Sequence, residues 1–309
     1  MNLRAKNASI ALAGAALLAL GLSACSGTAG ATTEEDSATT AGYAVDADTL
    51  VFGVVPDSAD TETNYQPLMD YIAQETGKTV DYHESTDYAA MIEASIAGKI
   101  DVASFAGFSY IVATNNGADI TPISSIIEED GQEPGYYSQA IVPMASDIDS
   151  LADFKGKKVC FVDPSSTSGY LFPSYNLLEE DIDPETDVTP VFAGKHDVSV
   201  QKTGEGVECE AGFAEDSEVE KSDQVRVIEE TMVPGAPLVY SNTLPDEVKD
   251  QLIEILAEVT IDDIIASGVD SADSDGFRSV FYATKPVDDA YYDLIRDICD
   301  KTDAAQCQG

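Results

Sequence analysis

The sequence contains few basic residues, and this scarcity excludes two classes of function. Of its 309 residues, 16 are Lys or Arg and 57 are Asp or Glu, so the formal net charge is −41. An acidic excess of this size repels the phosphate backbone of nucleic acids and the anionic headgroups of membranes. We therefore expect no nucleic-acid partner and no membrane docking through basic patches. An anionic ligand would have to be bound by local donors, against the field of the whole molecule.

Histidine and cysteine are also scarce, with two and five residues, and tryptophan is absent. The cysteines form no Cys-x-x-Cys pair and none stands beside a histidine, so a tetrahedral metal centre is not expected. We expect neither a metal nor another cofactor. With 44% hydrophobic residues the chain should nevertheless fold, and its length allows two domains or lobes.

The first 24 residues have the features of a signal peptide. Arg4 and Lys6 precede an apolar stretch at 10–22 that is too short to span a bilayer comfortably. The letters LSAC at 22–25 resemble a bacterial lipobox, in which the cysteine is lipidated after cleavage and becomes the mature N-terminus. That cysteine is Cys25. The alternative is an ordinary secretory signal in which this cysteine occurs by chance.

Residues 25–47 are rich in Ser, Thr, Ala, Gly and acids and have no apolar periodicity, so they predict a flexible tether after the lipidated cysteine. No later segment is long and apolar enough to cross a bilayer. We therefore expect an extracytoplasmic, monomeric body that is attached to the outer face of the cell membrane only through its lipid.

Four cysteines remain once Cys25 is assigned to lipid, and an even number in an oxidising compartment favours disulfides. Three pairings can be drawn. We favour Cys160 with Cys209 and Cys299 with Cys307, because the second pair is close in sequence and lies near a terminus that would otherwise fray.

Short apolar runs alternate with helical periodicity from residue 50 onward. The first series predicts strands at 50–55, 80–82 and 102–105, and helices at 65–75, 87–97 and 108–114. The second series predicts strands at 158–162, 188–192, 209–213 and 225–230, and helices at 170–179 and 198–203. A strand at 238–241 and helices at 245–259, 261–266 and 288–300 complete the pattern. Such alternation is typical of mainly parallel sheets covered by helices.

Two series of this kind predict an α/β protein with two lobes, each built on a mainly parallel mixed sheet and joined by a hinge. Crossovers near 138–145 and 231–238 assign residues 48–140 and 234–309 to lobe 1, and residues 141–233 to lobe 2. Open α/β sheets bind ligands outside the carboxyl ends of their strands. The ligand cleft is therefore expected between the lobes.

The segment at 163–169 (DPSSTSG) carries the clearest chemical signal. It lies between a predicted strand and a predicted helix, and it places several hydroxyls where the helix begins. A helix N-terminus offers free amide donors and partial positive charge, so a tetrahedral oxyanion can bind there without Arg or Lys. The plainer interpretation is a helix cap, for which one Ser would suffice. The segment is no Walker loop, because the Gly-Lys-Ser/Thr ending is missing.

This segment closely resembles the signature of the phosphate/phosphite/phosphonate-binding lipoproteins of ABC transporters, the PhnD family. Further stretches that agree with the family are TDYAAMIEA at 86–94, AGKIDVA at 97–103, GFSY at 107–110, GYYS at 135–138, GKHD at 194–197 and VPG at 233–235. The resemblance implies a type II periplasmic-binding-protein fold and a small phosphorus oxyanion as ligand. It also implies an ABC permease with its ATPase as partners.

The resemblance also implies which residues bind the ligand. In the family these are the Ser-Thr-Ser segment, tyrosines and a histidine, which here correspond to Ser166, Thr167, Ser168, Tyr88, Tyr136 and His196. Neighbouring strand residues face opposite sides, so Tyr137 is an alternative to Tyr136. A histidine can donate to an oxyanion, and burial against an anion would favour its charged form. His83 is interpreted as structural.

Two positions depart from the family pattern. Glu210 stands where an acid can face the substituent of the ligand. Ala236 stands where some aminophosphonate binders carry an Asp, which weakens the case for a cationic amino group, because a buried ammonium needs partners. Phosphite, methylphosphonate or phosphate is therefore the favoured ligand.

An enzyme would need a nucleophile, a base and an orienting group. Ser166, His196 and Asp197 would suit a hydrolase, but no Gly-x-Ser-x-Gly turn is present, and adjacent hydroxyls are redundant for a nucleophile. We expect a binding protein and no enzyme. A sensor lipoprotein for the same anions, without a transport role, remains the alternative.

Overall fold

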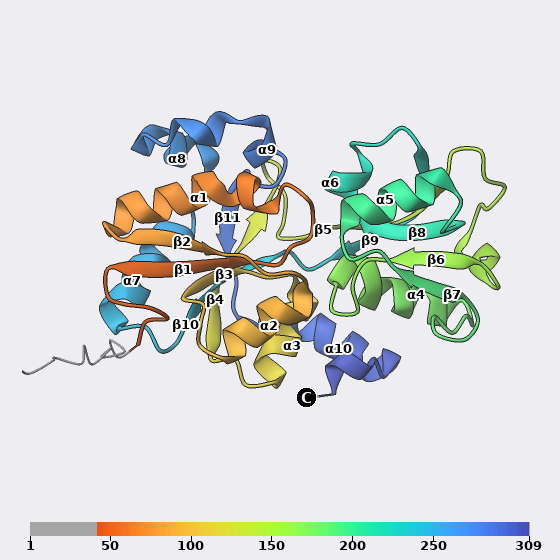
Figure 1. Cartoon of the computed structure of the whole chain (residues 1–309), viewed down its shortest axis with the longest axis horizontal. Helices are drawn as coiled ribbons and strands as arrows, with labels where there is room; N and C mark the ends of the chain where they lie inside the picture. The colour runs from red at the N-terminus through yellow and green to blue at the C-terminus, as the bar shows by residue number, and fades with distance from the viewer. Residues whose placement is uncertain (1–41, 309) are drawn as a thin grey trace, which may run out of the picture. The chain divides into compact units, whose positions relative to one another are not determined.

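The computed structural model describes residues 42–308, which form two α/β lobes, each built on one sheet (Figure 1). The signal peptide and Cys25 lie outside the described residues. In the described part, no helix is long and apolar enough to cross a membrane.

The first lobe contains a six-stranded sheet in the order β11-β4-β10-β3-β1-β2. Its strands are β1 (Thr49–Val54), β2 (Thr79–His83), β3 (Val102–Ser104), β4 (Ile120–Ile127), β10 (Pro237–Ser241) and β11 (Ala283–Pro286). Its helices are α1 (Thr61–Thr76), α2 (Tyr88–Ile96), α3 (Gly107–Asn115), α7 (Asp246–Leu256), α8 (Ile261–Ser267) and α9 (Asp275–Arg278).

Strand β1 shows why this sheet is covered on both faces. Leu50, Phe52 and Val54 point into a core shared with α1, α7 and α8. Val51 points to the other face, into a core shared with α2 and α3. Because successive side chains of a strand face opposite sides, an uninterrupted apolar run requires cover on both sides.

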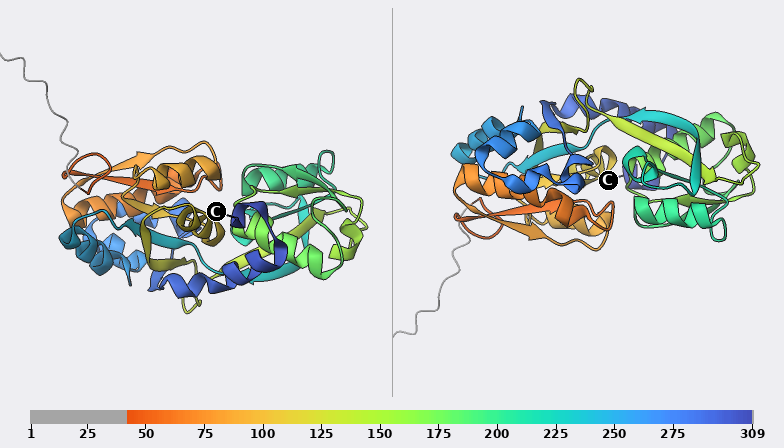
Figure 2. Two further views of the ribbon diagram at one scale, coloured as in Figure 1. Left: turned by 90° about the horizontal axis from the view of Figure 1, so that it is seen from below. Right: turned by 90° about the horizontal axis from the view of Figure 1, so that it is seen from above.

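The second lobe contains a five-stranded sheet in the order β7-β6-β8-β5-β9. Its strands are β5 (Tyr136–Pro143), β6 (Lys158–Phe161), β7 (Thr189–Phe192), β8 (Ala211–Glu215) and β9 (Val225–Val233). Its helices are α4 (Phe172–Glu179), α5 (His196–Glu205) and α6 (Asp216–Val219). Figure 2 shows the two sheets as separate halves of the body.

Both sheets are mixed, and they are less parallel than the sequence predicted. In the first sheet β1 is parallel to β2 and β3, whereas β10 and β11 form antiparallel pairs. In the second sheet β6 is parallel to β7 and β8, whereas β5 is antiparallel to β8 and β9. The antiparallel strands include the ones that carry the chain between the lobes.

The boundary between the lobes differs from the prediction. The whole of β5 (Tyr136–Pro143) pairs with β8 and β9, so the chain has already entered the second lobe at Tyr136. The crossover therefore lies between Ile127 and Tyr136, not after residue 140. Tyr136 and Ser168 consequently belong to the same lobe.

The C-terminal helix α10 (Asp293–Thr302) does not belong to lobe 1 alone. It packs against α3 of the first lobe and α4 of the second lobe. The Tyr292 ring, just before it, lies 5.2 Å from the Tyr110 ring, while Lys301 lies over the Tyr175 ring at 5.0 Å. The helix therefore bridges the two lobes on one side of the body (Figure 1).

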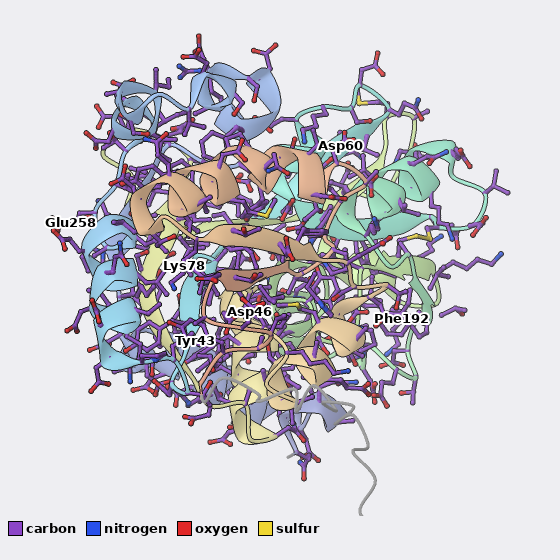
Figure 3. The ribbon with its side chains drawn as sticks, turned by 60° about the vertical axis from the view of Figure 1, so that its left-hand side comes forward. Tyr43, Asp46, Asp60, Lys78, Phe192 and Glu258 are labelled. Carbon is purple, nitrogen blue, oxygen red and sulfur yellow. A yellow bond between two sulfur atoms is a disulfide. The ribbon has the colours of Figure 1, made fainter. Side chains whose placement is uncertain are left out.

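The folded body begins earlier than residue 48. The Ala44 N–H donates to Asp101 Oδ1 at 2.9 Å, and Lys78 lies over the Tyr43 ring at 5.0 Å (Figure 3). The last residues of the predicted tether are thus packed on the first lobe. The sequence did not predict this, because the contacts of Tyr43 and Ala44 are with residues far along the chain.

Both favoured disulfides are present and confirmed. Cys160 bonds Cys209 with a Cα–Cα distance of 5.5 Å, and Cys299 bonds Cys307 at 5.6 Å. The first bond joins β6 to the segment just before the neighbouring strand β8, and the second fastens the C-terminal turn to α10. Neither bond crosses from one sheet to the other.

Candidate functional site

A cavity of about 60 Å³ lies between the two sheets. Its wall is formed by residues of both lobes, namely Val54, Val55, Asp57, Tyr65, Tyr88, Ser104, Phe105, Ala106, Ile126, Glu128, Gly135, Tyr136, His196, Glu215, Ser217, Ala236 and Val280. Val54, Ser104 and Glu215 are the last residues of β1, β3 and β8. The cavity therefore lies at the carboxyl ends of central strands, where open α/β sheets bind ligands. Since one water needs about 10–15 Å³ on this measure, the cavity suits a ligand of a few heavy atoms.

The Ser-Thr-Ser segment forms the start of a π-helical turn, Thr167–Leu171, that leads into α4. Each hydroxyl has a different role. Ser166 Oγ caps the turn by accepting from the Gly169 N–H at 3.0 Å, and Thr167 Oγ1 accepts from the Phe108 N–H of the other lobe at 2.8 Å. Ser168 Oγ is fully buried and lies beside the Tyr136 hydroxyl, but it makes no well-aligned hydrogen bond among the described residues.

Gly169 is required where the turn approaches β6. A Cβ atom at this position would lie 2.4 Å from Val162, which no side chain tolerates. The glycine thus lets the turn approach the end of β6 closely.

Tyr88 and Tyr136 both line the cavity, from α2 in the first lobe and from β5 in the second. Burial raises the pKa of the Tyr88 hydroxyl, and burial followed by the nearby Glu215 raises the pKa of the Tyr136 hydroxyl. Both phenols therefore remain protonated and can donate. Tyr137 lines a neighbouring pocket instead, so Tyr136 is the member of the pair that faces this cavity.

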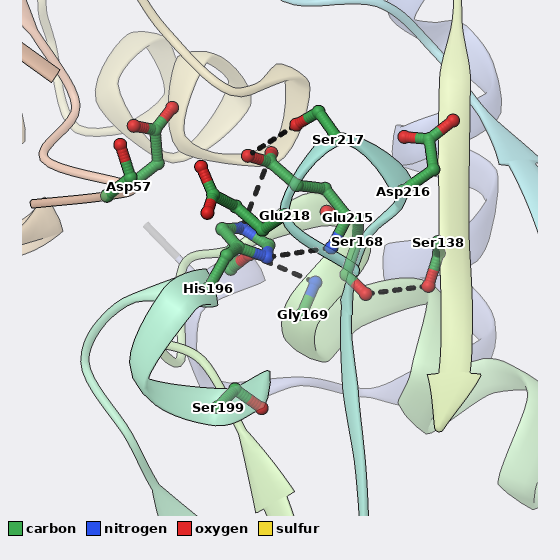
Figure 4. Close-up of polar contacts among 12 residues, drawn as sticks. Asp57, Ser138, Ser168, Gly169, His196, Ser199, Glu215, Asp216, Ser217 and Glu218 are labelled. Carbon is green, nitrogen blue, oxygen red and sulfur yellow. Dashed lines mark hydrogen bonds and ion pairs between the residues drawn. The ribbon is translucent and has the colours of Figure 1, made fainter. Parts of the chain in front are cut away.

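His196 begins α5 and is 2% exposed. Its Nδ1 accepts from the Glu215 N–H at 2.9 Å, which leaves the proton of the neutral ring on Nε2 (Figure 4). Burial lowers the pKa of the ring to about 3. Without a ligand the histidine is thus neutral, and Nε2–H is a donor on the cavity wall. The expectation that a bound anion would favour its charged form stays a prediction.

Three carboxyl groups that the sequence analysis did not select also line the cavity. They are Asp57 after β1, Glu128 after β4 and Glu215 at the end of β8. Burial raises the pKa of Asp57 to about 6 and that of Glu128 to about 8, and it raises the pKa of Glu215 well above its ordinary value. Each follows the carboxyl end of a strand, and that signal could have identified them.

Glu210 is not part of this wall. It lies before the amino end of β8, where its carboxylate accepts from the Lys158 N–H at 3.1 Å and lies 3.4 Å from Lys157 Nζ. At about 3.3 Å per residue, the strand carries the chain roughly 16 Å from Glu210 to Glu215. The expectation that Glu210 faces the ligand is therefore corrected, and Glu215 is the acid that β8 presents to the cavity.

The two lobes contact each other directly beside the cavity. The His196 N–H donates to Asp57 O at 2.8 Å, and Lys195 Nζ donates to Ser58 O at 3.0 Å. The Ala59 N–H donates to Asp197 Oδ2 at 3.3 Å. These bonds join the segment after β1 to the start of α5, and they describe a closed arrangement of the lobes.

Residues 52–284 match the family model described as "ABC transporter, phosphonate, periplasmic substrate-binding protein". The chain belongs to this family. It is 35% identical to the phosphate-import protein PhnD of Mycolicibacterium smegmatis, over 96% of each chain. It is 26% identical to the phosphonates-binding periplasmic protein of Escherichia coli, over 66% of this chain and 64% of the relative.

Solved structures of phosphonate-binding proteins share the fold. One is a binding protein of an ABC phosphonate transporter from Pseudomonas aeruginosa, with a TM-score of 0.71 and 24% identity over 84% of this chain and 89% of that chain. Another is PhnD1 from Prochlorococcus marinus in complex with methylphosphonate, with a TM-score of 0.70 and 17% identity over 83% and 99%. The chain therefore has the same two-lobed α/β fold as these phosphonate-binding proteins, as the resemblance of the sequence implied. Within residues 42–308, no cluster of His, Cys, Asp and Glu is arranged to hold a metal ion.

Proposed function

We propose that this periplasmic substrate-binding protein captures a small phosphorus oxyanion, such as a phosphonate, phosphite or phosphate, in the cavity between its lobes. It delivers the anion to an ABC permease that an ATPase drives. The observation that carries this proposal is the set of neutral donors around the cavity. On the wall they are the hydroxyls of Tyr88 and Tyr136 and the Nε2–H of His196, and the buried Ser168 hydroxyl lies beside that of Tyr136.

Neutral donors suit an oxyanion on a strongly acidic protein. The global charge of −41 repels anions, so binding depends on short-range hydrogen bonds inside the cavity. Buried Ser168 Oγ is without a partner within the described residues, and a ligand oxygen would supply one. Ser166 and Thr167 act beside it by holding the turn and by joining it to α3 of the other lobe.

A hydrolase is not supported by the same contacts. Ser166 Oγ accepts from the Gly169 N–H, and His196 Nδ1 accepts from the Glu215 N–H. The histidine nitrogen that would take up a proton is therefore occupied. We infer a binding protein with no catalytic residues.

Isothermal titration calorimetry tests the proposal directly. The purified protein is titrated with phosphate, phosphite, methylphosphonate and 2-aminoethylphosphonate, with chloride as the matched control anion. We expect at least one phosphorus oxyanion to bind with a Kd below about 10 μM, which corresponds to roughly 7 kcal/mol. Absence of binding by all four would refute the proposal.

We also propose that Cys25 carries lipid and anchors the protein to the outer face of the cell membrane. The support is the lipobox-like sequence at 22–25 together with membership of an extracytoplasmic family. Cys25→Ser should move the protein from the membrane fraction into the soluble fraction after cell lysis. If the role is transport, cells that lack this protein should fail to take up the bound anion, whereas loss of a sensor would leave the uptake machinery itself intact.

A further inference from the structure

The cavity wall combines neutral donors with three carboxyl groups, and this combination is unexpected for an anion site. Asp57, Glu128 and Glu215 approach from three different segments, whereas none of the described residues that form the wall is Lys or Arg. Two cationic side chains of neighbouring segments are engaged elsewhere. Lys221 lies 2.7 Å from Glu218, and Lys195 donates to Ser58 O at 3.0 Å.

An ionised carboxylate and a fully ionised oxyanion would repel each other in so small a space. A proton held between them converts that repulsion into an O–H···O⁻ hydrogen bond, which is short and strong. One proton is required for each such contact, because neither partner otherwise has a donor. Carboxyl groups can therefore contribute to oxyanion binding only where a proton is shared.

Glu215 is the carboxyl group best placed for this contact. Its Oε1 accepts from Ser217 Oγ at 3.2 Å, while its Oε2 lies 3.8 Å from His196 Nε2 and makes no hydrogen bond within the described residues (Figure 4). The side chain is 16% exposed. Oε2 and the Nε2–H of His196 thus stand side by side, an acceptor next to a donor.

We propose that the oxyanion is held through a proton shared between one of its oxygens and Glu215 Oε2, while a second oxygen accepts from His196 Nε2–H. This inference rests on the proposed function and specifies the form in which the ligand is bound. The backbone of Glu215 supports it, since its N–H fixes the His196 tautomer at 2.9 Å. Glu215 therefore fixes the Nε2–H donor of His196 through its main chain and supplies the acceptor Oε2 through its side chain.

The groups that face Glu215 are mostly acidic or uncharged, and the acidic ones favour a retained proton. They are Asp57 beyond β1, Glu128 beyond β4, Glu218 on α6 with its partner Lys221, the neutral His196 on α5, and the protonated Tyr65, Tyr88 and Tyr136. Burial is the largest cause that raises the pKa of Glu215, and the charges of Asp57, Glu128 and Glu218 add to it. Ser217 acts in the opposite direction through its hydrogen bond.

The shared proton reverses the pH dependence that a cradle of donors alone would show. Donors alone bind a dianion more tightly than a monoanion, so affinity would rise or stay level as the ligand loses its last proton. With a shared proton the affinity falls by about tenfold per pH unit once that proton is lost. The sign of the slope therefore separates the two arrangements.

The experiment is calorimetry with methylphosphonate from about pH 6 to about pH 9, a range in which the donors Tyr88, Tyr136 and His196 keep their protonation. The wild-type affinity should fall towards high pH. In Glu215→Gln the amide can donate to the dianion, so the fall should be absent or reversed. Glu210→Gln is the matched control, because it changes the same residue type at the opposite end of the same strand, and it should keep the wild-type profile.

Methanesulfonate shows which partner brings the proton. It matches methylphosphonate in shape but carries no proton at these pH values. If it binds at low pH and is lost as pH rises, Glu215 supplies the proton. If it fails to bind throughout while methylphosphonate binds, the ligand supplies it, and both results support a shared proton.

A wild-type affinity that is level or rises with pH would overturn the inference, as would a Glu215→Gln profile equal to that of the wild type. The wild-type measurement requires no substitution, so a level or rising affinity overturns the inference even if Glu215→Gln does not fold. Failure of every phosphorus oxyanion to bind at any pH would instead refute the proposed function.

Discussion

The backbone N–H of Glu215 donates to His196 Nδ1 at 2.9 Å, while the carboxylate of the same residue lies 3.8 Å from His196 Nε2. The last residue of β8 thus fixes the tautomer of the first residue of α5. Because the hydrogen bond uses the main chain, substitution of the Glu215 side chain should leave the tautomer unchanged.

The histidine should therefore stay neutral over the physiological pH range. Burial lowers the pKa of His196 to about 3, so its ring nitrogen shifts should not titrate between about pH 5 and pH 9. Nitrogen-detected NMR of labelled protein should show a protonated Nε2 and an unprotonated Nδ1. The only other histidine of the sequence is His83, at the end of β2, so two histidine signals have to be assigned. A His196 signal that titrates near pH 6.5 would contradict this arrangement.

Ser168→Ala should lower ligand affinity without lowering the stability of the ligand-free protein. Its buried hydroxyl makes no well-aligned hydrogen bond in the described residues, and the neighbouring Tyr136 hydroxyl also lies beside Thr167, so its removal should cost little stability. Loss of one charge-assisted hydrogen bond to the ligand should weaken binding by about ten- to hundredfold. Calorimetry and thermal melts measure the two effects. Ser174→Ala, a buried serine in the following helix, is the control and should retain the wild-type affinity.

Thr167→Ala should behave differently, because this hydroxyl accepts from the Phe108 N–H at 2.8 Å. Its removal leaves a buried N–H unpaired, which costs about 1–3 kcal/mol in the closed form. We expect a lower melting temperature together with weaker binding. Thr167→Ser keeps the hydroxyl and should restore most of both properties. Equal melting temperatures for Thr167→Ala and the wild type would show that the contact does not hold the lobes.

Ligand binding should favour the closed lobes. Tyr88 belongs to the first lobe, whereas Tyr136, Ser168 and His196 belong to the second, so a ligand that contacts both sets stabilises only the closed form. Small-angle scattering should show a smaller radius of gyration at saturating ligand. Lys195→Ala removes the donor to Ser58 O and should shift the ligand-free protein towards the open form. Identical radii with and without ligand would argue for a rigid body.

The buried carboxyl groups predict that the ligand-free protein loses stability as pH rises. Burial raises the pKa of Asp57 to about 6 and that of Glu128 to about 8, so the folded state holds protons that the unfolded state has released. For each group, the free energy of unfolding falls by about 1.4 kcal/mol per pH unit between its ordinary pKa in the unfolded chain and its raised pKa in the folded protein. Denaturant titrations from about pH 5 to about pH 9 should show this fall, and Glu128→Gln should reduce it.

Reduction of the disulfides should lower stability, and ligand should restore part of the loss. The Cys160–Cys209 bond spans 49 residues, for which chain entropy predicts about 4 kcal/mol, and the Cys299–Cys307 bond spans 8, for which it predicts about 2.5 kcal/mol. A ligand that binds only the folded form stabilises it by mass action. Mass mapping of the oxidised protein should find these two pairs. A Cys160–Cys299 link would contradict the structure.

The sequence by itself determined the α/β class, the positions of most strands and helices, and the segment that carries Ser166, Thr167 and Ser168. These features depend on local information, such as the apolar run of β1, helical periodicity, and hydroxyls at a helix start. It also determined the favoured disulfides. The predicted lobe boundary was wrong because the sequence of β5 is that of a strand but does not show to which sheet the strand belongs. Only the pairing of β5 with β8 and β9 assigns it to the second lobe.

Only the tertiary structure decided which acids surround the cavity. Asp57, Glu128 and Glu215 each lie at or after the carboxyl end of a strand, but the sequence, which holds 57 acidic residues, does not show which strand ends meet at one cavity. The strand direction places Glu215 at the cavity and Glu210 roughly 16 Å away at the other end of β8. The charge state of His196 was decided in the same way, because it depends on burial and on an N–H from a residue 19 positions further along the chain.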